Sequence, residues 1–134
     1  MSSEQTATSL EQHVRRIFEV IDAMDVRAMA AMITDDAQGV DEISRAWIRG
    51  RAALEGYFGQ IEGAVDEVNS RVHDVHVTEW GDAGTVTCVL EQTYRAQGRE
   101  HRISAPTSLT FRREAGEWRI AVFHSVALPE QPTG

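Results

Sequence analysis

The stretch DDAQGVDEISRAWIRGRAALEGYF, residues 35–58, decides the fold of this chain. Its pattern predicts the end of a helix, a short strand that carries Asp41, a turn, a second short strand through Trp47, and a new helix after Gly50. The hairpin sets an acidic side chain into an otherwise apolar region. We therefore expect a pocket to form beside Asp41.

Three helices are predicted in the N-terminal half. Ser9 and Gln12 have the spacing of a capping box, so the first helix is expected to begin there. Asp25 can cap a second, shorter helix, which residues 34–36 would end. The first and third helices each have one apolar face, formed by Leu10, Val14, Ile17, Phe18, Ile21 and Met24 in the first and by Leu54, Tyr57, Phe58, Ile61 and Val65 in the third.

Four long strands are predicted after Asp66. They alternate in polarity, are rich in β-branched and aromatic side chains, and are separated by short turn sequences; they cover residues 68–80, 84–97, 100–113 and 117–127. Such a series forms an antiparallel meander, which is expected to bulge or bend at Pro106. The predicted fold class is α+β, with three N-terminal helices packed on one face of a curved antiparallel sheet.

Alternation along these strands assigns their side chains to two faces. The face expected under the helices is largely apolar and carries His73, Val75, Val77, Val86, Cys88, Leu90, Gln92, Tyr94, Ile103, Ala105, Thr107, Leu109, Phe111, Trp118, Ile120, Val122 and His124. The other face mixes polar side chains with Val89 and Phe123. Apolar side chains on an outer face predict a partner, and a homodimer through this face is the simplest one.

Composition and charge limit the location and the partners. The 21 acidic residues outnumber the 13 basic ones, which argues against nucleic acid and anionic membranes as partners. No apolar run is long enough to span a bilayer, and the polar N-terminal residues lack a signal-peptide core, so a cytoplasmic location is expected. Residues 1–8 are expected to be a disordered N-terminus, 9–128 a single domain and 129–134 a flexible tail.

Asp41 and His124 are candidate acid–base groups. A carboxylate in an apolar pocket can accept a proton from a bound molecule, which makes Asp41 the candidate general base. The alternative is a solvated strand-end aspartate, or an ion-pair partner for one of the nearby arginines, Arg45, Arg49 and Arg51. His124, expected on the inner face, is a candidate acid–base or positioning group, and a hydrogen-bonded core histidine is the alternative.

Further side chains are predicted to line the pocket. Tyr94 is a candidate for polarising or positioning a bound molecule, and the candidate binding residues are Trp47, Tyr57, His73, Gln92, Thr107 and Trp118. This lining suits a small, largely apolar molecule; the alternative for each residue taken alone is that it belongs to the core. His73 and His76 fall on opposite faces of a strand, and no metal-ligand or phosphate-loop motif is evident, so neither a metal nor a cofactor is expected.

Several short motifs, in a fixed order, resemble a known family. They are Asp35-Asp36-Ala37, Asp41, Gly50-Arg51-Ala52-Ala53-Leu54 with Tyr57-Phe58, and, after the strands, Gly116-Glu117-Trp118-Arg119-Ile120 with His124-Ser125. Over about residues 10–127 this order resembles the SnoaL-like branch of the NTF2-like superfamily, which includes ketosteroid isomerase and polyketide cyclases. The resemblance implies a cystatin-like, cone-shaped α+β barrel, a pocket between helices and sheet, and a dimer through the sheet. Fold alone does not carry function.

Ketosteroid isomerase allows a comparison of single positions. In that enzyme the base is an aspartate on the strand after the Asp-Asp-Ala motif, and Asp41 matches it. Its oxyanion donors are a tyrosine on the first helix and a protonated carboxylic acid on the third long strand. The matching positions here hold Ile17 and either Thr107 or Ser108. Losing such a donor typically costs ~10²–10³ in rate, so ketosteroid isomerase chemistry itself is not expected.

Three hypotheses for the function follow. The first is a pocket for a small, largely apolar molecule, in which any chemistry would be cofactor-free proton transfer of the isomerase, cyclase or dehydratase kind. Asp41 would be the base, and His124 and Tyr94 would position the substrate. The second is a non-catalytic ligand-binding or protein-association module of the NTF2-like superfamily. The third, an epoxide hydrolase-like site, would need two carboxylates and an arginine such as Arg71 to converge on a water.

Overall fold

The computed structural model describes residues 9–129. The elements follow in the order α1 (Leu10–Asp22), α2 (Val26–Ala31), β1 (Ile33–Asp41), β2 (Ile48–Arg49), α3 (Arg51–Ala64), β3 (Val65–Trp80), β4 (Ala83–Ala96), β5 (Arg99–Glu114) and β6 (Glu117–Ser125). The predicted disordered N-terminus, 1–8, and residues 130–134 of the predicted tail lie outside the described residues. Within the described part, none of the helices has the length and hydrophobicity that crossing a membrane requires.

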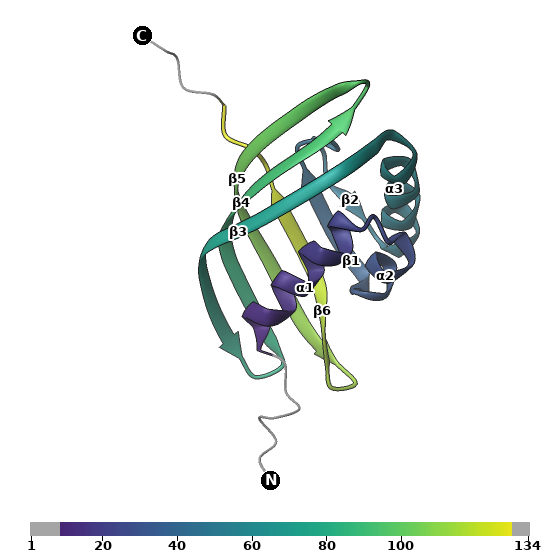
Figure 1. The fold of residues 1–134 in the computed structure, drawn as a ribbon. Coiled ribbons are helices and arrows are strands. Elements are labelled where there is room, and N and C mark those ends of the chain that lie inside the picture. Colours follow the sequence, from purple (N-terminus) through teal and green to yellow (C-terminus); the bar gives the residue numbers. More distant parts are fainter. Residues whose placement is uncertain (1–8, 130–134) are drawn as a thin grey trace.

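The six strands form one curved, unclosed sheet in the order β2-β1-β6-β5-β4-β3. Strands β3 to β6 form the predicted antiparallel meander. Strand β1 runs parallel to β6, so the sheet is mixed and not antiparallel throughout. Figure 1 shows the long strands curving around α1, while α2 and α3 lie together beside β1 and β2. The predicted α+β fold class, with helices packed on a curved sheet, is confirmed.

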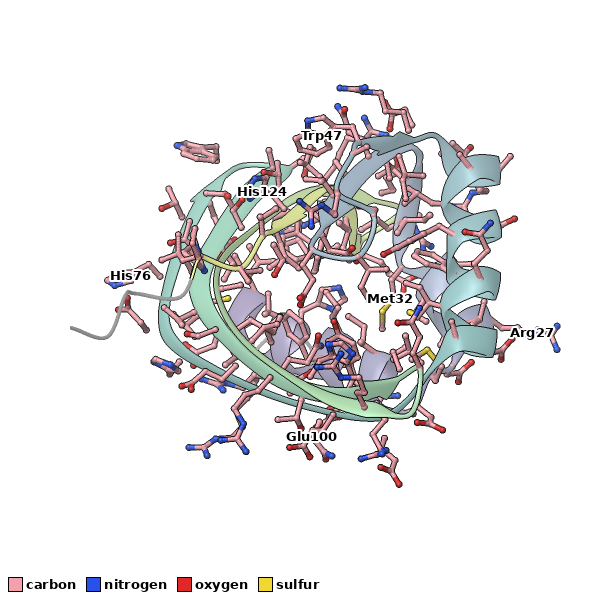
Figure 2. All side chains as sticks on the ribbon, turned by 90° about the horizontal axis from the view of Figure 1, so that it is seen from above. Arg27, Met32, Trp47, His76, Glu100 and His124 are labelled. Carbon is pink, nitrogen blue, oxygen red and sulfur yellow. The ribbon has the colours of Figure 1, made fainter. Side chains whose placement is uncertain are left out.

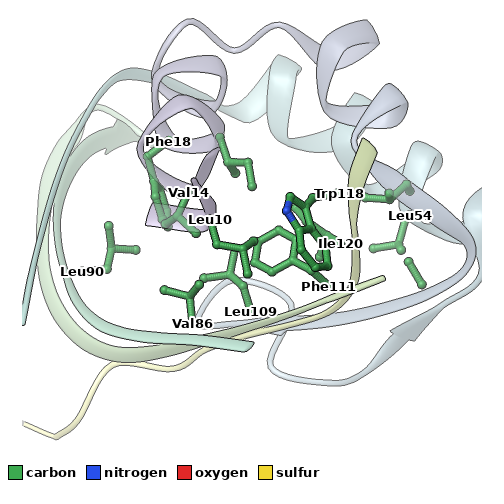
Figure 3. Packing of buried hydrophobic residues seen from close by; sticks show 13 residues of the cluster. Leu10, Val14, Phe18, Leu54, Val86, Leu90, Leu109, Phe111, Trp118 and Ile120 are labelled. Carbon is green, nitrogen blue, oxygen red and sulfur yellow. The ribbon is translucent and has the colours of Figure 1, made fainter. Parts of the chain in front are cut away.

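Helix α1 starts at the predicted cap and closes the concave face. The Ser9 Oγ accepts a hydrogen bond from the Gln12 amide at 3.1 Å, and the Gln12 side chain accepts one from the Ser9 amide at 3.2 Å. The apolar face of α1 then packs on inward side chains of the long strands (Figure 3); the cluster includes Leu10, Val14, Phe18, Val86, Leu90, Leu109 and Phe111. Through this packing α1 covers the concave face of the sheet.

The second helix and the hairpin differ from the prediction. Helix α2 ends at Ala31, and Ile33 already belongs to β1, where it pairs with Ile120 of β6. Ile33 and Thr34 are buried, so sheet pairing overrides the local helical pattern. Trp47 precedes the two-residue strand β2 and is not part of it.

Pro106 is accommodated without the predicted bulge. The β4–β5 ladder passes through the pair Val89 and Pro106 with no shift of register. The β5–β6 ladder ends at the pair Thr107 and Ser125, one residue away. Proline lacks an amide hydrogen and is tolerated where the ladder needs no further donor, which explains its place at this boundary.

Two register shifts elsewhere in the sheet move side chains to the face opposite to the predicted one. The register shifts in β3 between His73 and His76, and between β5 and β6 at Thr110 and Phe111. Because an extra residue reverses the alternation, the predicted inner position of His73 is wrong, and Val72 and Val75 pack on the core there. The predicted inner positions of Val122 and His124 are also wrong, since Phe123 and Ser125 occupy the inner face.

Candidate functional site

Two adjoining lobes form a cavity between the helices and the concave sheet. The first lobe has a volume of about 130 Å³ and the second about 90 Å³. Five residues line both lobes: Ile21, Met24, Asp41, Ile61 and Phe123. Figure 2 shows Met32, which lines the first lobe, pointing into this interior, while Arg27, His76 and Glu100 point away from it. The sheet and all three helices therefore contribute to the lining of the two lobes.

The two lobes differ in character. The first is walled almost entirely by apolar side chains of α1, α2, α3 and β1, including Met29, Met32 and Phe58. The second collects polar groups at one end, among them Glu42, Gln92, Tyr94 and Ser125. A largely apolar cavity with a few convergent polar groups is the usual form of a small-molecule site.

Asp41 lies where the two lobes meet, at the end of β1. Its Oδ1 accepts hydrogen bonds from the amides of Ile43 at 2.9 Å and Ser44 at 2.8 Å, and from the Tyr57 hydroxyl at 2.6 Å. The two amide bonds close the turn after β1, as aspartate commonly does. Burial, reinforced by the Asp41 charge, raises the pKa of Tyr57, so the tyrosine remains a donor. Among the described residues no donor reaches Oδ2.

Two of the three nearby arginines, Arg49 and Arg51, bond to other groups than Asp41. Arg49 donates to the Gln38 side chain at 2.9 Å. Arg51 donates to Asp35 at 2.8 Å and to the carbonyl oxygens of Ala30 and Ile33 at 2.6 Å each. Arg51 therefore ties the start of α3 to the junction of α2 and β1, and the alternative of an ion pair between Asp41 and Arg49 or Arg51 is wrong.

The polar end of the second lobe contains a carboxyl that the sequence analysis did not single out. Burial raises the pKa of Glu42, and the neighbouring Asp41 charge adds to this rise, while the Tyr94 hydroxyl opposes it. Burial and the Glu42 charge together raise the pKa of Tyr94 to about 12. Glu42 and Tyr94 thus form a pair of weakly acidic groups beside Asp41.

Gln92 and Thr107 take part in hydrogen bonds at the border of the second lobe. Gln92 lines the lobe and donates to the Ser70 hydroxyl at 3.0 Å, and this hydroxyl donates to Asp22 of α1 at 2.6 Å. Thr107 is buried next to Ser125, with 2.8 Å between the two hydroxyl oxygens. Ser125 faces the lobe and Thr107 does not line it.

Four of the predicted site residues lie away from the cavity. Trp47 is 41% exposed, and its ring centroid lies 6.0 Å from that of the exposed His124, at the rim seen in Figure 2. His73 lies on the outer face, 2.7 Å from Glu91. Trp118 is buried with Phe111 and Ile120 (Figure 3) and lines neither lobe. Of the predicted set, Asp41, Tyr57, Gln92 and Tyr94 are brought together.

The residues that sequence reasoning missed are Glu42, Phe123 and Ser125. Alternation assigns Glu42 to the face opposite Asp41, but β1 ends at Asp41 and the chain turns there. Phe123 and Ser125 follow the register shift in β6. The neighbouring carboxylates Asp41 and Glu42 were the one signal in the sequence that could have marked this end of the cavity.

Three observations on the described residues concern metal, thiol and epoxide chemistry. Residues 9–129 contain no group of three or more His, Cys, Asp or Glu side chains placed to hold a metal ion. Cys88 is buried, and burial raises the pKa of its thiol to about 11. Within the same range no arginine lines either lobe, so Arg71 does not complete the epoxide hydrolase-like arrangement.

Comparison with known proteins identifies the family. The SnoaL-like domain family matches residues 10–129. The chain belongs to the SnoaL-like family. This confirms the resemblance noted in the sequence. None of the curated proteins is similar enough in sequence to count as a match.

Solved structures place this SnoaL-like chain in the NTF2-like fold. An NTF2-like protein of unknown function from Pseudomonas putida has a TM-score of 0.79 and 17% identity, covering 97% of this chain and 92% of its own. A ketosteroid isomerase-like protein from Erwinia carotovora atroseptica has a TM-score of 0.76 and 18% identity, covering 90% and 94%. The CaMKII hub of S. rosetta has a TM-score of 0.75 and 15% identity, covering 89% and 94%. At such identities the likeness shows the fold alone.

Proposed function

We propose that this SnoaL-like chain binds a small, largely apolar molecule in the two-lobed cavity. The observation that carries the proposal is the shared wall: Ile21, Met24, Ile61 and Phe123 face both lobes, so one ligand can occupy the apolar lobe and reach the polar end. Apolar area supplies affinity in such a site, and a few polar groups set the orientation.

Filling the shared wall should block binding. We expect Ile61→Trp to weaken the binding of 2-methylnaphthalene roughly tenfold or more, because the indole occupies space on the border of both lobes. Saturable shifts in two-dimensional NMR spectra measure the affinity. Glu62→Trp places the same side chain on the exposed face of α3 and should leave the affinity unchanged. Equal affinity for both variants, or no saturable binding to the parent protein, would refute the proposal.

The chemistry that the lining favours is cofactor-free proton transfer of the isomerase, cyclase or dehydratase kind. Asp41 is the proposed base, acting through Oδ2, because Oδ1 is held by three donors. Tyr94 is the proposed positioning group at the polar end. The ketosteroid isomerase-like neighbour supports this class through the fold only.

Self-association is a second candidate function, and it is compatible with the second hypothesis from the sequence, that of a protein-association module. Trp80, at the end of β3, is 62% exposed and shares its face with His76, which points away from the interior (Figure 2). A large exposed aromatic side chain on an outer sheet face favours a second copy of the chain as the partner, and one structural neighbour is a CaMKII hub.

A dilution series tests this second candidate. We expect sedimentation velocity to show a dimer that dissociates on dilution, and Trp80→Ser to shift the equilibrium to the single protomer, because the indole is then no longer available for burial. A single protomer mass at every concentration would refute self-association. The binding proposal does not depend on the result.

A further inference from the structure

Two buried polar atoms near the second lobe have no hydrogen-bond partner among the described residues: Oε1 of Glu42 and Nε2 of His101. Such atoms are uncommon in folded proteins, because a polar atom that loses contact with water without a replacement partner destabilises the fold. Neither atom belongs to the hydrogen bonds that hold Asp41 and Tyr57. Both therefore require a partner that residues 9–129 do not supply.

The two atoms flank the same side chain. Tyr94 of β4 and His101 of β5 are direct cross-strand partners, and their rings stack with centroids 5.0 Å apart and an angle of 11°. Tyr94 and Glu42 line the second lobe together. Burial raises the pKa of the Glu42 carboxyl, and the His101 ring opposes this rise. Glu42 and Tyr94 thus line the polar end of the second lobe, and His101 stacks directly on Tyr94 without lining the lobe itself.

We propose that Glu42 and His101 bind a hydroxyl group of the ligand at the polar end of the second lobe. The ligand class is then an apolar molecule that carries a phenolic or enolic hydroxyl. This inference rests on the proposed function, because it assigns the end of the same cavity.

A hydroxyl fits these two atoms better than other groups. It donates one hydrogen bond and accepts another, so it can bridge a carboxylate and an N–H, or a protonated carboxyl and a bare ring nitrogen. A ligand carboxylate would meet Asp41 and Glu42 in a lobe that no described arginine lines, and a methyl ether has no proton to donate. The site therefore selects by chemistry as well as by size.

Matched naphthalenes test the proposal. Near neutral pH, 2-naphthol should bind roughly tenfold more tightly than 2-methylnaphthalene or 2-methoxynaphthalene, and 2-naphthoate should bind more weakly than the hydrocarbon. Glu42→Leu and His101→Phe should each abolish the preference for 2-naphthol while keeping the affinity for 2-methylnaphthalene. The phenyl ring of His101→Phe preserves stacking on Tyr94. The double variant should lose little more than either single one, because both atoms bind one hydroxyl.

The possible results separate this inference from the proposed function. No saturable binding of 2-methylnaphthalene would overturn both. Binding of 2-methylnaphthalene without a preference for 2-naphthol would overturn only the hydroxyl site. A preference for 2-naphthol that survives Glu42→Leu or His101→Phe would also overturn the hydroxyl site. Glu62→Leu, on the exposed face of α3, controls for the loss of a carboxylate, and circular dichroism confirms that each variant is folded. If Glu42→Leu fails to fold, His101→Phe decides the outcome alone.

Discussion

Asp41→Asn is expected to lower the catalysed hydrogen–deuterium exchange of 2-tetralone by ~10²–10⁴, the usual contribution of a positioned general base. This ketone has acidic C–H groups beside its carbonyl and an apolar bicyclic body that suits the first lobe. Asparagine keeps an oxygen at Oδ1, so the bonds from Ile43, Ser44 and Tyr57 can persist. The amide nitrogen that replaces Oδ2 cannot accept the proton. Turnover should therefore fall while the melting temperature stays nearly constant.

The loss of α-proton signals in deuterium oxide, followed by NMR, measures this exchange after the protein-free rate is subtracted. Asp66→Asn removes an exposed carboxylate from β3 and should leave the rate unchanged. If the parent protein does not accelerate exchange, or if Asp41→Asn is as fast as the parent, Asp41 is not a base. The binding of apolar molecules would remain the proposed function in that case.

Phe111→Ala should lower the free energy of unfolding by about 3–5 kcal/mol, the range found for large aromatic side chains in cores. Phe111 is 1% exposed, and its ring meets that of His13 edge-on with centroids 5.7 Å apart. It lies in the main apolar cluster together with Trp118 and Ile120 (Figure 3). Removing it leaves a hole that this close packing cannot fill.

Urea unfolding with a constant m-value measures the difference. Phe123→Ala is the matched control, because Phe123 is only half-buried and already borders both lobes, so less packing is lost. An equal decrease in the free energy of unfolding for the two variants would contradict the prediction. Phe111 would then contribute no more to stability than a residue of the cavity wall.

The fold was predictable because most of the alternation is regular. Between the register shifts it placed Val86, Leu90 and Leu109 correctly, and all three are almost fully buried. It failed at His73 and His124 because one extra residue reverses every side chain that follows. The position of such a bulge depends on pairing with strands far along the chain, and local pattern does not encode it.

The site was predictable only in part, for a related reason. Asp41 and Tyr57 come from one contiguous stretch, and their side chains meet at 2.6 Å. Glu42 and Tyr94 are far apart in the sequence and line the same lobe only because the sheet curls. No periodicity marks such a meeting, whereas an unpartnered buried atom in the folded chain does.

Helix α2 gives a separate means of changing what the protein accepts. Met29 of this helix and Met32, its C-cap, border only the first lobe, and no residue of the six-residue helix is fully buried. Methionine side chains bend to fit irregular shapes, so this wall can yield to molecules of different outline. If the protein is evolved in the laboratory to accept bulkier or slimmer ligands, the substitutions should accumulate at this wall. The polar end of the second lobe should then keep its preference.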